Sequence, residues 1–313
     1  MHLLLLRLPE LCPKHSDMST AGGPSEKRVL LPSLAVALSG AAWGGFWYPL
    51  RWLENMGIGG AWVSVIFFAV AAVTPLPWLL RKSAWAGFSS ALLNGTLLGL
   101  AFTLYTVSLV MTDVIHAILL FYLTPVWSTL AGLAFLGERL TVSRGLAMAF
   151  GFAGMAFILG FEDGLPLPRN AGDWLALVSG MLWAAGTLRS FFRPSAGVSL
   201  PVFTFCLGGI VSSLAVALAA AALGSPISEL SNLPQGLPWA ILFAMILFVP
   251  PNFMVLWAAQ RIDSGRVGIL LMTEVLAGAV TAALFSGEQF GAMELTGTML
   301  ILCAGLVEVL GRR

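Results

Sequence analysis

The sequence predicts an all-α polytopic membrane protein with ten transmembrane helices, and three observations carry this prediction. Hydrophobic residues make up 58% of the 313 residues and charged residues 10%, with a mean hydropathy of +0.91, values outside the range of water-soluble domains. Ten apolar stretches are long enough to cross ~30 Å of hydrocarbon. Lys and Arg are concentrated in every second loop between these stretches. Because hydrocarbon offers no hydrogen-bond partners, such spans form helices.

The chain begins with a predicted disordered cytoplasmic tail, residues 1–28. Leu3 to Leu6 form an apolar run shorter than the ~7 to 15 residues of a signal-peptide core, and Met18 lies closer to the expected start of the protein. The ten expected spans then follow at 29–50, 60–80, 86–110, 114–136, 144–160, 174–192, 199–223, 238–260, 266–286 and 292–310.

The distribution of Lys and Arg tests this arrangement, because basic residues flanking membrane spans gather on the cytoplasmic side. With ten spans, 14 of the 16 basic residues fall on one side. Arg51 and Arg169 fall on the other. One span more or fewer would destroy this asymmetry, so we expect both termini to be cytoplasmic.

A weak internal repeat divides the spans into two groups of five. Residues 104–140 and 254–290 share a polar turn with Asp113 or Asp263 and an apolar run that ends in Gly-Glu, at 137–138 or 287–288. Five is odd, so the second repeat enters the membrane from the opposite side. We expect a first repeat at 29–160, an outer linker at 161–173 and a second repeat at 174–310. Inverted repeats are typical of alternating-access carriers that bind substrate near the bilayer midplane.

The repeats also carry motifs that resemble the EamA-type members of the drug/metabolite transporter superfamily. The first repeat reads Leu123-Thr124-Pro125-Val126, then Leu136-Gly137-Glu138-Arg139-Leu140, with Gly151 and Gly154 following. The second reads Glu274-Val275 where the family often has Glu-Pro, and Gly287-Glu288 followed by Gln289 in place of Arg. The resemblance covers residues 29–310 and implies a transporter. Its aromatic residues look most like those of the aromatic amino-acid exporters.

Aromatic side chains in the spans are the first candidates for substrate binding. Trp and Tyr usually lie at membrane interfaces or pack between helices. For each aromatic candidate, the alternative to substrate binding is therefore such a structural role. Trp43 and Trp183 are expected near the centres of equivalent helices in the two repeats, where a ring can stack on a ligand and the indole N–H needs a partner. The candidates are Trp43, Tyr48, Tyr105, Tyr122 and Trp183.

Three polar residues within the spans complete the candidate site. Glu274 is expected near the middle of the ninth span, where a carboxyl group is costly unless it faces protein or a water-filled cavity. It could bind a substrate ammonium, carry a coupling proton or serve structure alone. His116 is expected near the outer side of the fourth span. Asn252 follows Pro250-Pro251, which removes two backbone donors and should bend the eighth span. The Gly40–Gly44 and Gly95–Gly99 steps predict close helix packing.

Missing motifs narrow the function further. The sequence has no GxxxxGK[ST] motif for ATP binding, no metal-ligand spacing and no nucleophile elbow. We therefore expect no enzyme activity, metal or cofactor. The net charge of +1 gives no reason to expect nucleic acid. The expected partners are a small-molecule substrate and the lipid bilayer, with a monomer in the simplest case.

The resulting hypothesis is a multi-pass protein of a bacterial inner membrane. It exports small amphipathic metabolites, foremost aromatic or other bulky apolar amino acids, by alternating access. The alternative is a proton-coupled exporter of hydrophobic cations or other metabolites. An intramembrane enzyme or lipid-handling scaffold is the third hypothesis and has the least support in the sequence.

Overall fold

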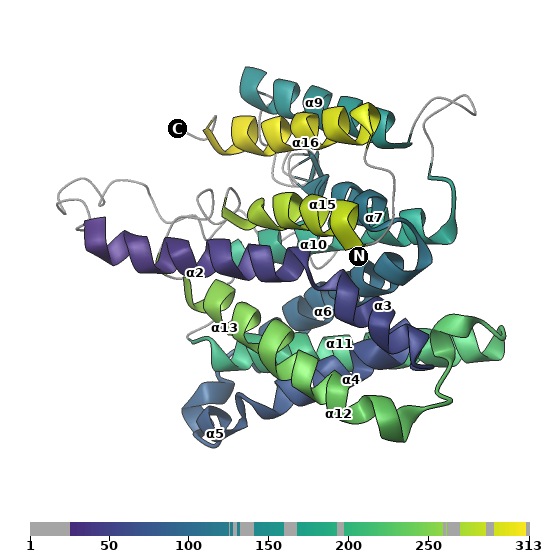
Figure 1. The fold of residues 1–313 in the computed structure, drawn as a ribbon. Coiled ribbons are helices and arrows are strands. Elements are labelled where there is room, and N and C mark those ends of the chain that lie inside the picture. Colours follow the sequence, from purple (N-terminus) through teal and green to yellow (C-terminus); the bar gives the residue numbers. More distant parts are fainter. Residues whose placement is uncertain are drawn as a thin grey trace.

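The computed structural model describes residues 26–124, 126–127, 130–131, 141–159, 168–192, 197–258, 261, 270–285 and 291–310. Its regular structure there is helical, apart from an isolated antiparallel bridge between Ile58 and Leu230. Many of the long helices lie side by side, and α9 and α16 pair at the top of the view (Figure 1). The elements are α2 (Glu26–Gly44), α3 (Trp47–Asn55), α4 (Gly60–Val73), α5 (Leu76–Leu79), η2 (Lys82–Trp85), α6 (Phe88–Met111), α7 (Val114–Phe121), α9 (Val142–Leu159), α10 (Ala171–Phe192), α11 (Ser199–Ala222), η3 (Pro226–Ser228), α12 (Leu233–Phe243), the π-helical turn η4 (Ala244–Phe248), α13 (Val249–Ala258), α15 (Thr273–Phe285) and α16 (Ala292–Leu310).

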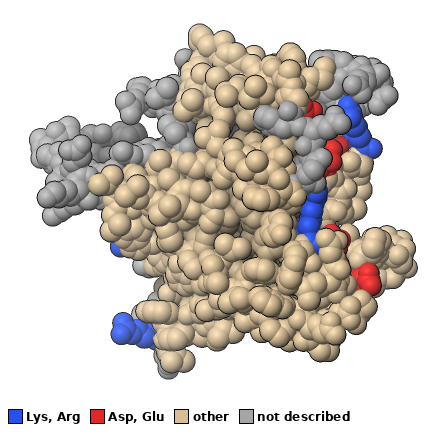
Figure 2. Space-filling view, in the orientation of Figure 1, with Lys and Arg blue, Asp and Glu red and all other residues tan. Residues whose placement is uncertain are grey.

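Several of these helices have the length and composition of membrane spans. Within the described residues four qualify outright: Leu30–Asn55, Phe88–Met111, Ser199–Ala222 and Leu233–Val255. Shorter apolar helices occupy Gly60–Val73, Gly145–Gly154, Thr273–Phe285 and Ala292–Val307. Figure 2 shows the matching surface, a broad face with charged side chains only towards its edges. The predicted all-helical class is confirmed for the described residues, and four of their helices are long and apolar enough to cross a membrane.

Within the described residues the first, second and eighth predicted spans are interrupted, and interruptions in the fourth and ninth lie at the candidate site described below. The first continues to Asn55 and turns at Gly45–Phe46, between α2 and α3. The second turns at Thr74–Pro75, where Pro75 has no N–H to continue the helix and the Thr74 hydroxyl donates to the Ala71 carbonyl at 2.6 Å. The eighth begins earlier than predicted, at Leu233, and contains the π-helical turn.

Two helices end in the same glycine-dependent motif. After α3, Gly57 has a φ of 89°, and the N–H groups of Gly57 and Ile58 donate to the carbonyls of Glu54 and Leu53. This is a Schellman motif, and Leu53 and Ile58 supply its buried apolar contact. Gly224, with a φ of 66°, ends α11 in the same way. Only glycine adopts this backbone conformation without steric cost.

Glycines also bring α6 and α11 into backbone contact. A Cβ atom on Gly99 would lie 2.7 Å from the Phe205 carbonyl oxygen, and one on Gly208 would lie 2.6 Å from the Gly95 oxygen. No side chain fits between the helices at these positions. The predicted packing role of the Gly95–Gly99 step is therefore confirmed.

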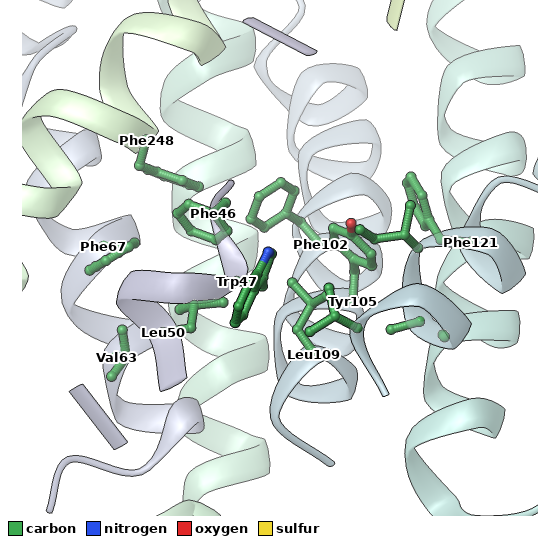
Figure 3. Packing of buried hydrophobic residues seen from close by; sticks show 14 of the residues in the cluster. Phe46, Trp47, Leu50, Val63, Phe67, Phe102, Tyr105, Leu109, Phe121 and Phe248 are labelled. Carbon is green, nitrogen blue, oxygen red and sulfur yellow. The ribbon is translucent and has the colours of Figure 1, made fainter. Parts of the chain in front are cut away.

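Phenylalanine rings fill the space where α2, α4, α6, α11 and η4 meet. Phe102 and Phe248 lie 5.4 Å apart between ring centroids, and Phe68 and Phe248 lie 5.2 Å apart. Most pairs meet edge to face, an arrangement that aligns the positive ring edge with the negative face. Figure 3 shows part of this row of rings, with Phe102 placed between Phe46 and the side chain of Tyr105. The members are Phe46, Phe67, Phe68, Phe102, Phe205 and Phe248.

Several motif residues fall outside the described part of the chain. They are Pro125, Gly137, Glu138, Arg139, Asp263, Gly287, Glu288 and Gln289.

Gly99→Ala should destabilise the protein by about 1 to 3 kcal/mol, because the added methyl group overlaps the backbone of α11 and forces the helices apart. Gly145→Ala in α9 is the matched control, since a Cβ there meets nothing within 4 Å and alanine favours the helix. Thermal unfolding in detergent measures both variants. Equal melting temperatures for the two would contradict the close contact.

Candidate functional site

The candidate site centres on Glu274, a carboxyl group buried in the membrane-spanning region. The residue lies in the first turn of α15 and is 3% exposed. Its helix begins at Thr273 after a turn at Met272. The N-terminus of a helix carries partial positive charge, which favours a carboxylate at this position.

Two tyrosines from the first repeat bind this carboxyl group. The Tyr105 hydroxyl, on α6, donates to Oε1 at 2.9 Å. The Tyr122 hydroxyl, just after α7, donates to Oε2 at 2.7 Å and also lies 2.8 Å from the Leu271 carbonyl oxygen. Both carboxyl oxygens are therefore satisfied, as a buried charged or polar group requires.

The helices on both sides of this cluster are interrupted at equivalent positions. α7 ends at Phe121 and is followed by a turn at Tyr122 and Leu123, and the turn before α15 falls at Met272. Tyr122 and Met272 are 150 positions apart, the spacing of the internal repeat. In membrane proteins built from two repeats, paired interrupted helices point to a binding site, which makes this cluster a candidate. At the first turn the Thr124 hydroxyl bonds the Phe121 carbonyl, and at the second the Thr273 hydroxyl bonds that of Leu270.

Glycines let α2 approach the Glu274 backbone. A Cβ on Gly44 would lie 2.6 Å from the Glu274 carbonyl oxygen, and one on Gly40 would lie 3.1 Å from that of Leu271. Thr273 adds a bond from its hydroxyl to the Ala37 carbonyl at 2.9 Å. The predicted packing role of the Gly40–Gly44 step is confirmed, and its partner is the segment that carries Glu274.

Aromatic rings extend from the carboxyl group in two directions. On one side Phe121 stacks on Tyr105 with ring centroids 4.6 Å apart and meets Trp183 of α10 edge to face at 5.9 Å. On the other side Phe102 connects Tyr105, at 6.2 Å, to Trp43 of α2, at 6.1 Å. Figure 3 shows Phe102, Tyr105 and Phe121 in one row.

Five of the eight residues predicted for the site thus belong to one neighbourhood: Trp43, Tyr105, Tyr122, Trp183 and Glu274. Sequence reasoning did not select Phe121, although it precedes Tyr122 directly. The only feature that could have pointed to Phe121 is its position at the end of α7, directly before the turn at Tyr122.

The other three predicted residues lie elsewhere. Tyr48 is 52% exposed, and its ring contacts Trp47 and Phe285. Asn252 is buried in α13 and donates to the Phe248 carbonyl at 2.7 Å. Asn252 therefore bonds within the bend formed by η4 and Pro250-Pro251.

His116 belongs to a second polar cluster, which joins the end of α6 and the start of α7 to the start of α10. The Asp173 carboxylate is fully buried. One of its oxygens accepts from the Thr112 hydroxyl at 2.6 Å, and the other accepts from the backbone N–H of Arg169 at 2.9 Å. Asn170 donates from its side chain to Thr112 and accepts from the Asp173 N–H. His116 Nδ1 lies 3.9 Å from Asp173.

Of this second cluster, sequence reasoning selected only His116. Asn170 caps the start of α10 by accepting from the Asp173 backbone N–H, and Asp173 accepts in turn from the backbone N–H of Arg169, one residue before the cap. An Asn directly before an apolar run is the sequence signal of such a cap. Arg51 lies close by and donates to the Leu109 and Thr112 carbonyls at 3.0 and 2.8 Å. These carbonyls belong to the end of α6, where a helix leaves acceptors without partners and cations are favoured.

Thr112→Val should lower the free energy of unfolding by about 1 to 3 kcal/mol, because it removes the donor to buried Asp173 and the acceptor for Asn170 while keeping the side-chain shape. Thr112→Ser keeps the hydroxyl and is the matched control. Thermal unfolding in detergent should rank the wild type and Thr112→Ser above Thr112→Val. A Thr112→Val variant as stable as the wild type would show that these bonds contribute nothing.

Comparison with known proteins gives the family. The EamA-like transporter family matches the chain twice, over residues 30–160 and 170–308. A crystal structure whose title reads only "Crystal structure of protein" superposes with a TM-score of 0.59 at 17% identity, over 91% of this chain and 96% of that one. Such an identity shows a shared fold alone. No curated protein matches the sequence. Since the family matches span most of the chain, this multi-pass membrane protein belongs to the EamA-like transporter family of the drug/metabolite transporter superfamily.

Proposed function

We propose that the protein exports small amphipathic metabolites, foremost aromatic and other bulky apolar amino acids, by alternating access. One observation carries the proposal. A buried carboxyl group, Glu274, is held by tyrosines of the opposite repeat at paired helix interruptions, and aromatic rings surround it.

The carboxyl group supports an amine as the polar part of the substrate. In the part of the chain that the structure describes, Glu274 bonds hydroxyl groups and no cationic side chain. A carboxylate in a low-dielectric site is stabilised strongly by a positive charge at close range. A substrate ammonium supplies that charge and can exchange one tyrosine hydrogen bond for its own.

The rings support a bulky apolar group as the other part. Phe121 and Trp183 present aromatic surface on one side of the site, and Phe102 and Trp43 on the other. Aromatic surface stacks on aromatic ligands and attracts the edge of their rings. It also attracts an ammonium group placed over a ring face.

The proposed topology is ten spans in two inverted five-helix repeats, at 29–160 and 174–310, with both termini cytoplasmic in a bacterial inner membrane. The tail at 1–28 and the linker at 161–173 lie outside the repeats. The helix interruptions 150 positions apart support this symmetry. The protein works as a monomer in this proposal, with the substrate and the bilayer as its partners.

In this topology the cluster around Asp173 lies on the outer side of the membrane and closes the route from the binding site to the outside. Its bonds join α6 and α7 of the first repeat to α10 of the second. Release of substrate outwards then requires Thr112 and Asp173 to separate. Alternating access moves one repeat against the other around a fixed site. The hydrogen bonds that join Thr112 to Asn170 and Asp173 would break and reform in each cycle.

A second candidate, proton-coupled export of hydrophobic cations or other metabolites, is favoured by the hydroxyl of Tyr122. This group has one hydrogen but lies within bonding distance of two acceptors, Glu274 and the Leu271 carbonyl. If Glu274 is protonated, it can donate to Tyr122 while Tyr122 donates to Leu271. If it is ionised, Tyr122 donates to Glu274. The site therefore satisfies both protonation states without rearrangement.

A pH gradient separates the two candidates. In proteoliposomes with the membrane potential clamped, exchange of one proton for one substrate concentrates the substrate about tenfold per pH unit, since a tenfold ratio equals one pH unit in free energy. A facilitator gives equal concentrations inside and outside at any gradient.

Glu274→Gln should reduce the initial rate of labelled phenylalanine uptake into proteoliposomes at least about tenfold, because the amide cannot offer a negative charge to the ammonium. Glu294→Gln is the control, since this carboxylate lies at the start of α16 and bonds the Gly291 N–H. The control should keep wild-type uptake. Wild-type uptake no faster than that of empty vesicles would contradict the proposed function itself.

A further inference from the structure

The indole N–H of Trp43 is a buried donor without an acceptor in the part of the chain that the structure describes. Trp43 is 7% exposed, and none of the described residues places an acceptor within hydrogen-bonding distance of its Nε1. Buried polar groups are hydrogen-bonded in the great majority of cases, and an exception calls for an explanation. Packing alone explains the ring but leaves the N–H unexplained.

The position of Trp43 provides the explanation. On α2 it lies between Gly40 and Gly44, which contact the α15 segment next to Glu274. Its ring meets Phe102 of α6 edge to face, one helical turn before Tyr105. The backbone beside Trp43 therefore contacts the segment that carries Glu274, and its ring contacts α6 one turn from Tyr105.

Trp47 shows what a structural tryptophan looks like in the same place. It lies four residues later, at the start of α3, and contacts α15. Its Nε1 donates to the Thr281 hydroxyl at 3.0 Å. The fold thus supplies an acceptor to the Trp47 indole and, within the described residues, none to the Trp43 indole.

We propose that the N–H of Trp43 binds the carboxylate of the substrate. This assignment rests on the proposed function and narrows its substrate class to zwitterions. The ammonium group lies at Glu274, the carboxylate at Trp43, and the side chain of the substrate lies against Phe121 and Trp183. The N–H gains its missing acceptor when substrate binds. An amine without an acceptor group leaves the N–H unsatisfied, so the site discriminates against simple hydrophobic cations.

The test compares phenylalanine with phenethylamine, which has the same ring and amine but no carboxylate. The KM for labelled phenylalanine and the inhibition constant of phenethylamine against that uptake are measured in proteoliposomes. Trp43 is replaced by 3-benzothienylalanine, in which sulfur replaces the N–H with nearly the same shape, and separately by phenylalanine. Loss of a hydrogen bond to a charged acceptor should raise the KM at least about tenfold. The inhibition constant of phenethylamine should change by about twofold or less.

Trp47→Phe is the matched control. It removes an indole N–H that the protein itself satisfies, so it should leave the ratio of the two constants unchanged even if stability falls. An unchanged ratio in the benzothienylalanine protein, with uptake intact, overturns the role of Trp43 and leaves the proposed function standing. A wild-type protein that takes up no phenylalanine overturns both.

Discussion

The burial of the Glu274 carboxyl group is the constraint on which the rest of the site depends. A carboxyl group within the hydrocarbon region is costly unless it is hydrogen-bonded, and here Tyr105 and Tyr122 supply the two donors. Both donors belong to the opposite repeat, so this requirement ties α6 and the end of α7 to α15. The helix interruption at Met272 and the glycines of α2 allow these segments to approach. Glu274 is therefore both the candidate binding group and the residue that joins the two repeats.

Much of this arrangement could be predicted because lipid constrains sequence strongly. The helical class followed from composition, and α6, α10, α11 and α16 begin and end within a few residues of the predicted spans. Glu274 stood out because carboxyl groups are rare in such spans. Tyr105 and Tyr122 were predicted as site residues, but their hydrogen bonds to Glu274 were not, because they lie 169 and 152 positions away in the sequence. An aromatic residue that donates to a carboxylate and one that only packs have the same sequence signal.

Other features of the site could not be predicted, because they depend on local contacts that leave no pattern in the sequence. No proline lies at the interruption before α15, and Val275 stands where the family often has proline, so the turn had no signal of its own. Asp173 fell at the edge of a predicted linker, where a carboxylate is ordinarily solvated, yet the fold buries it against Thr112. Asn252 was predicted from its position after Pro250-Pro251, and nothing in the sequence indicated that its amide donates to the Phe248 carbonyl one turn earlier.

The glycine contact between α2 and α15 has a mechanical consequence. Side chains normally separate packed helices and absorb small shifts by changing rotamer, but at Gly40 and Gly44 two backbones touch directly. No compliant layer remains there. In the proposed function, a displacement of the Glu274 backbone during binding or release of substrate would therefore be passed directly to α2. This contact would couple the first helix of one repeat to the binding segment of the other.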